Sequence, residues 1–135
     1  MIEAAIERAF TSGLEFLLKE GYHFEGMTIT ESKASGKFYS FKFKSEVARR
    51  GFSVTFFQQS DSIHSSIDDL DNDFTFSDSG AMKVEAARFK DIEGDFESRV
   101  ATYLDGLKDE VLAKHIEVLR GAAFKNDAFD WSPYK

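Results

Sequence analysis

The sequence predicts an α+β fold with an N-terminal helix, an antiparallel sheet of four to five strands, a long C-terminal helix and an aromatic tail. Apolar residues recur every three or four positions near both ends of the chain, and they alternate with polar residues in the middle. The 135 residues contain one proline and no linker-like segment. Residues 1–135 are therefore expected to form a single domain, with helices covering one face of the sheet.

The first apolar stripe predicts a helix from about residue 2 to residue 20. Gly21 stands where a left-handed C-terminal cap is expected, and the aromatic residues behind it favour a strand. The members of the stripe recur at spacings of four and three: Ile2, Ile6, Phe10, Leu14 and Leu17.

From residue 21 to about residue 76 the period changes to two. In KFYSFKFK, the rings of Tyr39, Phe41 and Phe43 are expected on one face of a strand, with Lys42 and Lys44 on the other. A second strand is predicted in GFSVTFF and a weaker one around residues 63–67, with a short edge strand at Phe74 and Phe76. Turn signals between these runs predict a meander, and they lie at Ser35-Gly36, Arg50-Gly51 and Ser60-Asp61.

Residues 81–93 fit a strand and the start of a helix equally well, so both assignments stay open. Beyond Gly94 one stripe predicts a helix from Asp95 to Arg120, which Asp105-Gly106 could bend or break. The tail after Gly121 contains four aromatic residues outside any period, and it is interpreted either as a lid over the fold or as an anchor for a partner. These residues are Phe124, Phe129, Trp131 and Tyr134.

The composition excludes several classes of function. No cysteine is present, which removes disulfides, thiolate nucleophiles and thiolate metal sites. The N-terminus lacks the character of a signal peptide, and no apolar run is long enough for a membrane span. We therefore expect a cytoplasmic protein that does not bind a membrane. A net charge of −7 argues against nucleic acid as a partner.

The stretch IDDLDNDF concentrates four aspartates: Asp68, Asp69, Asp71 and Asp73. Three of them match alternate ligand positions of an EF-hand calcium loop. Phe74 stands where that loop needs glycine and Gly80 where it needs glutamate, so no calcium site is predicted. No metal or other cofactor is expected.

No catalytic arrangement is recognisable in the sequence, so we expect a protein that is not an enzyme. His23, His64 and His115 are dispersed, and neither a nucleophile elbow nor a phosphate-binding loop is present. The acidic run, flanked by serines, offers no pair of carboxylates in contrasting environments.

Two interpretations of the acidic run remain. In the first, its carboxylates stand free in water and attract a basic protein partner, and the proposed partner-binding residues are Asp68, Asp69, Asp71, Asp73, Asp78 and Trp131. In the second, cations of the neighbouring hairpin neutralise them, above all Lys42, Lys44 and Arg49.

The segments LLKEGYHF, KFYSFKFK and GFSVTFF, with the late helix from Asp95, resemble in arrangement the small bacterial α+β immunity proteins of toxin systems. The resemblance implies a cytoplasmic protein without chemistry of its own that binds a basic toxin domain and blocks its active site. Two alternatives stay open: a dimeric secretion chaperone for an effector, and a carrier or enzyme with a phenylalanine-lined pocket for an apolar ligand. The oligomeric state is also left open, a homodimer included.

Overall fold

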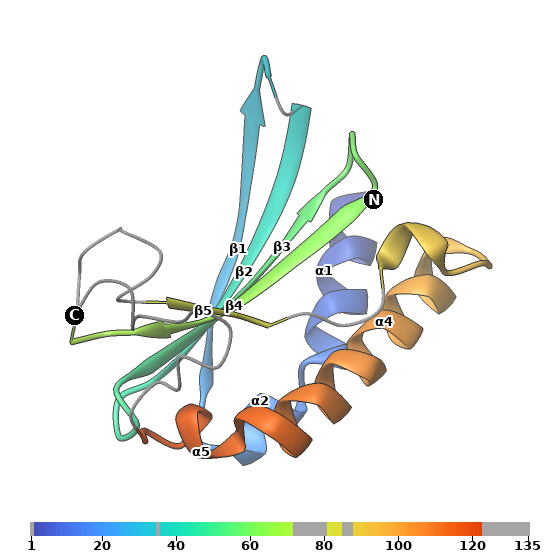
Figure 1. The fold of residues 1–135 in the computed structure, drawn as a ribbon. Coiled ribbons are helices and arrows are strands. Elements are labelled where there is room, and N and C mark those ends of the chain that lie inside the picture. Colours follow the sequence, from blue (N-terminus) through green and yellow to red (C-terminus); the bar gives the residue numbers. More distant parts are fainter. Residues whose placement is uncertain (1, 35, 72–80, 85–87, 123–135) are drawn as a thin grey trace, which may run out of the picture.

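The computed structural model describes residues 2–34, 36–71, 81–84 and 88–122. One antiparallel sheet is formed by consecutive strands in the order β1-β2-β3-β4-β5, and the helices lie together on one side of it (Figure 1). The α+β prediction is thereby confirmed. The elements are α1 (Ile2–Gly13), α2 (Phe16–Lys19), β1 (His23–Ser32), β2 (Gly36–Ser45), β3 (Arg50–Phe57), β4 (Ser62–Asp69), β5 (Ala81–Val84), the 3-10 helix η1 (Phe89–Asp91), α4 (Phe96–Glu110), the π-helix η2 (Val111–His115) and α5 (Ile116–Leu119).

The N-terminal helix is divided, so the prediction of one helix over residues 2–20 is wrong. α1 ends at Gly13 and α2 begins at Phe16. Gly13 lies directly against the side chain of Leu104, where a β-carbon would collide, and glycine is a weak helix former. The hydroxyl of Thr11 also donates to the carbonyl of Glu7 at 2.8 Å within the last turns. The division leaves the described stripe buried, at Ile6, Phe10, Leu14 and Leu17.

The two faces of the sheet differ as the alternation predicts. Tyr39, Phe41 and Phe43 are buried on the face that the helices cover, whereas Lys42 is exposed. In the register, Phe41 pairs with Val54, and this row packs under α1. The rings of Phe10 and Phe41 stack with centroids 4.5 Å apart.

The late helix begins as predicted. The side chain of Asp95 accepts a hydrogen bond from the amide of Ser98 at 2.8 Å and caps α4. Gly106, where the sequence allowed a bend or break, does not interrupt α4. An irregularity occurs instead at Val111–His115, where the backbone adopts a π-turn before α5 continues to Leu119.

The C-terminal end of α5 is fixed to the sheet by two buried side chains. The guanidinium of Arg50 donates to the carbonyls of Val118 at 3.2 Å and Ala122 at 2.7 Å. The hydroxyl of Tyr22 donates to the carbonyl of Leu119 at 2.5 Å, and burial raises the pKa of this hydroxyl far above its usual value. The Tyr22 contact satisfies a carbonyl at the helix end, where carbonyls lack intrahelical partners, and the Arg50 contacts add donors at Val118 and Ala122.

Residues 81–93, which the sequence left undecided, contain both a strand and a short helix. β5 extends the sheet beside β4, in register from Asp68↔Ala81 to Ser65↔Val84, and η1 follows at Phe89–Asp91. The predicted edge strand at Phe74 and Phe76 and the aromatic tail lie outside the described residues. In the part of the chain that the structure describes, no helix has both the length and the apolar character needed to cross a membrane.

Candidate protein-binding site

The three described aspartates of IDDLDNDF, which we call the β4 acidic segment, are Asp68, Asp69 and Asp71. Asp68 lies on the open face of the sheet near the end of β4. Its carboxylate accepts hydrogen bonds from the hydroxyls of Ser53 at 2.8 Å and Ser66 at 2.9 Å. Asp68 is therefore held by a hydroxyl of its own strand and by one of the neighbouring strand β3.

The other two aspartates pair with arginines at the start of β3. Asp69 lies 3.4 Å from Nη1 of Arg50, and Asp71 lies 2.9 Å from Nε of Arg49. Asp71 raises the pKa of the Arg49 guanidinium by hydrogen bonding and by charge. The expectation that these carboxylates stand free in water is wrong for Asp69 and Asp71.

The second interpretation, neutralisation by the neighbouring hairpin, holds for these two residues. The cations are Arg49, as expected, and Arg50, rather than the expected lysines. Lys44 pairs with Glu46 at 3.0 Å, and this hydrogen bond is the main cause of the lowered pKa of Glu46. The remaining members of the predicted site, Asp73, Asp78 and Trp131, lie outside the described residues.

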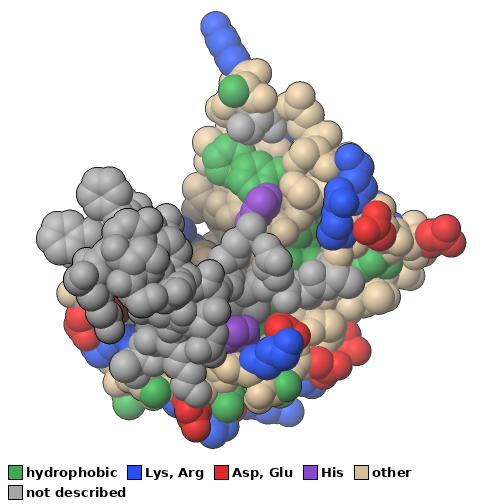
Figure 2. All heavy atoms as spheres, in the orientation of Figure 1, with side chains coloured by type: hydrophobic (Ala, Val, Ile, Leu, Met, Phe, Trp, Pro, Cys, Tyr) green, Lys and Arg blue, Asp and Glu red, His purple; other side chains and the backbone are tan. Residues whose placement is uncertain are grey.

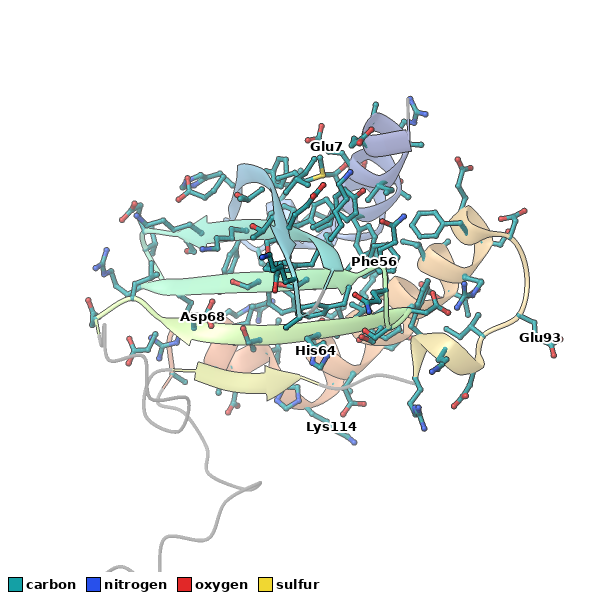
Figure 3. All side chains as sticks on the ribbon, turned by 90° about the horizontal axis from the view of Figure 1, so that it is seen from above. Glu7, Phe56, His64, Asp68, Glu93 and Lys114 are labelled. Atoms are coloured by element: carbon teal, nitrogen blue, oxygen red, sulfur yellow. The ribbon has the colours of Figure 1, made fainter. Side chains whose placement is uncertain are left out.

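A second acidic run, the α4 acidic segment, consists of Asp91, Glu93, Asp95 and Glu97, all of which are exposed. Asp95 caps α4, and the hydrogen bond from the Ser98 amide lowers its pKa. No described lysine or arginine forms an ion pair with the other three. Figure 3 shows Glu93 and Asp68 at opposite ends of the molecule.

A pocket of about 590 Å³ opens beside the start of α4, and we call it the corner pocket. Its apolar floor is formed by Ile6 and the rings of Phe56 and Phe96, whose centroids lie 5.4 Å apart. Figure 3 shows Phe56 directed toward the helical side of the sheet. The remaining lining residues are Ala5, Gln58, Asp61, Asp95 and Glu97.

The wall of the corner pocket is held in place by Arg99 on α4. Its Nη2 lies 2.6 Å from Asp61 in the β3–β4 turn, and its Nε donates to the carbonyl of Ile92 at 2.9 Å. The guanidinium carbon also lies 4.2 Å from the centre of the Phe89 ring. One arginine therefore joins the turn, the loop before α4 and the helix itself.

The α4 acidic segment was not predicted from the sequence, because the consecutive aspartates of IDDLDNDF gave the more conspicuous acidic run. The signal was present in DIEGDFE, where four carboxylates alternate with other residues and no lysine or arginine intervenes. The corner pocket had no comparable signal. Its walls come from α1, from β3 and its turn, and from α4, which only the tertiary fold brings together.

The open face of the sheet carries a smaller aromatic group. The ring of Phe57 lies 5.2 Å from those of Phe38 and His64. Hydrophobic side chains lie beside a histidine on the face shown in Figure 2. Serine and threonine surround them in the register, as in the pairs Ser40↔Thr55 and Ser53↔Ser66.

His23 pairs with Glu25, and His64 packs on Phe57. Among the described residues, no group of three or more histidines and carboxylates is arranged to hold a metal. The central rings pack solidly, with Phe10, Phe41 and Phe52 fully buried. An apolar-ligand cavity inside this core therefore has no support, and the corner pocket lies at its edge.

Comparisons of this chain with protein-family models, with curated proteins and with solved structures find no match.

Proposed function

We propose that the protein is a non-enzymatic protein-binding module, of the immunity type, that binds a basic partner domain through the α4 acidic segment and the corner pocket beside it. One observation carries the proposal. Exposed carboxylates that form no ion pair with a described residue lie beside an apolar pocket. Charges of this kind attract an oppositely charged partner and orient it, whereas buried apolar contacts supply most of the affinity.

The distribution of ion pairs supports this choice of surface. In the β4 acidic segment, Asp71 and Asp69 are paired with Arg49 and Arg50, and Asp68 accepts hydrogen bonds from two serine hydroxyls. The α4 acidic segment places Glu93 and Glu97 in solvent, with no described cation paired to them. Its field therefore extends outward from the end of the molecule at which α4 begins.

The test uses two variants of equal net charge. In the test variant, Asp91→Asn, Glu93→Gln and Glu97→Gln neutralise the α4 acidic segment. In the control, Glu31→Gln, Asp105→Asn and Asp109→Asn neutralise three exposed carboxylates elsewhere. Removing three negative charges from a chain at −7 leaves both variants at −4.

Wild type and both variants are immobilised and exposed to an extract of the source organism, and the captured protein is then purified for kinetic measurement. We expect wild type and control to capture the same basic protein, and the test variant to associate with it about tenfold more slowly at low salt. Failure of wild type to capture a basic protein contradicts the proposal, as does equal association of test variant and wild type. A stable homodimer that captures an unfolded cargo would indicate the chaperone alternative instead.

A further inference from the structure

Resting on the proposed function, we infer that the corner pocket receives an arginine side chain of the basic partner. The pocket combines an apolar floor with carboxylates at its rim. Its volume of about 590 Å³ is in the range of ligand-binding pockets and is large enough for a side chain of a partner. A purely apolar occupant would bury the rim carboxylates without compensation, which is costly. The occupant must therefore have an apolar stem and a positive end.

The charge balance at the rim favours a cation. Asp61 is compensated by Arg99, which leaves Asp95 and Glu97 as two negative charges. The start of α4 contributes roughly half a positive charge from the helix dipole. The rim therefore keeps a net charge of roughly −1.5, so an anion would be repelled although a helix begins here.

Free acceptor atoms remain at this rim. The hydrogen bond from Arg99 goes to Oδ2 of Asp61, and the bond from Ser98 goes to Oδ1 of Asp95. The side chain of Ser98 also donates to the carboxylate of Asp95. Among the described residues, no donor contacts the second oxygen of Asp61 or the carboxylate of Glu97. These oxygens can accept hydrogen bonds from a guanidinium, which has five N–H donors.

The molecule already uses this chemistry a few residues away. The guanidinium of Arg99 lies over the ring of Phe89 while it binds the carboxylate of Asp61. The corner pocket offers the same pair of features, since Phe96 and Phe56 form the floor and Asp95 and Glu97 the rim. A planar guanidinium stacks on rings and binds carboxylates through two donors, which an ammonium group cannot do. Arginine is thereby favoured over lysine.

The test titrates N-acetyl-arginine amide into the isotope-labelled full-length protein and follows backbone amide signals by NMR. N-acetyl-lysine amide is a matched probe with an ammonium group in place of the guanidinium. N-acetyl-norleucine amide is a matched probe whose side chain is uncharged. We expect saturable shifts at Ala5, Gln58 and Phe96 with the arginine probe, weaker ones with lysine and weaker still with norleucine.

Two single variants make the result specific. Glu97→Gln should weaken binding of the arginine probe about tenfold, because it removes a charge-assisted hydrogen bond at the rim. Glu93→Gln removes the same charge from an exposed position that does not line the pocket and should change binding by less than about twofold. Both positions are exposed, and the dispersion of the amide signals will report whether each variant is folded.

Equal shifts with norleucine and arginine, no shifts at the pocket, or equal weakening by both variants would each overturn the inference. Its failure is distinguishable from failure of the proposed function. If the arginine probe does not bind but the basic partner still depends on the α4 acidic segment, the pocket assignment alone is wrong. If the probe binds but no basic partner is captured, the proposed function is wrong, and only the affinity of the corner pocket for an arginine side chain stands.

Discussion

The β4 and α4 acidic segments look alike in sequence but differ in what surrounds them in space. The β4 acidic segment lies at the end of β4, beside Arg50 at the start of β3 and Arg49 just before it, so Asp69 and Asp71 are paired with cations within the fold. The α4 acidic segment leads into a helix, where only Asp95 has a described partner, and that partner is Ser98, an uncharged residue that donates through its amide and its side chain. The comparison teaches that the density of charge along a chain does not measure the field that the fold presents to solvent.

The largest expected effect tests the compensation of the β4 acidic segment. Replacing Arg50 with methionine should lower the free energy of unfolding by about 3–5 kcal/mol, the usual cost of breaking a buried charge pair on one side. The substitution leaves Asp69 and the carbonyls of Val118 and Ala122 without this donor. Urea unfolding followed by circular dichroism measures the loss.

Arg49→Met is the matched control, because the side chain of Arg49 is 45% exposed whereas that of Arg50 is 8% exposed. Its loss should be much smaller, since exposed ion pairs contribute little. Equal losses in the two variants would show that Arg50 is not the residue that fixes this end of the sheet.

A smaller effect is expected at the α4 acidic segment, where Asp95 is a cap. Its folded-state pKa is lowered from 3.8 by the hydrogen bond from Ser98, so its contribution to stability is present above 3.8 and is lost as the pH falls through the lowered value. Asp95→Ala should lower the melting temperature by a few degrees at neutral pH, and this difference should shrink on acidification. Thermal melts at a series of pH values measure it.

Asp95→Asn separates capping from charge, because asparagine caps a helix without ionising. Its melting temperature should lie between those of wild type and Asp95→Ala at neutral pH. A difference between wild type and Asp95→Ala that stays constant as the pH falls would contradict the assignment of the carboxylate as the cap.

Much of the fold could be predicted because local periodicity reports burial. The alternation of Tyr39, Phe41 and Phe43 identified the covered face, and Gly21, with φ of 89°, adopts the left-handed conformation expected of a cap. The break after Gly13 was not predicted, although glycine is a weak helix former. The close approach of Leu104, 91 positions later in the chain, belongs to the tertiary fold, which no local pattern encodes.

The candidate site was harder to predict, and the two acidic segments show why. The pairing of Arg50 with Asp69 follows from the antiparallel register of β3 and β4, in which these residues face each other. The turn signal at Ser60-Asp61 would have indicated that register once both strands were assigned. The corner pocket depends on how α1 and α4 cross over the end of the sheet, which no local pattern encodes.

The smallest expected effect comes from making the β4 acidic segment resemble the α4 acidic segment. Arg49→Gln removes the cation that lies 2.9 Å from Asp71 but leaves Arg50 in place, so stability should hardly change. In the same NMR titration with N-acetyl-arginine amide, the amides of Leu70 and Asp71 should then respond where those of wild type do not. The response should stay weaker than at the corner pocket, because the described contacts of Asp71 include no apolar surface like the floor of that pocket.

Lys44→Gln is the control for this prediction, since it removes a neighbouring cation that pairs with Glu46 and not with Asp71. If wild type and Arg49→Gln respond equally, internal pairing is not what distinguishes the two segments.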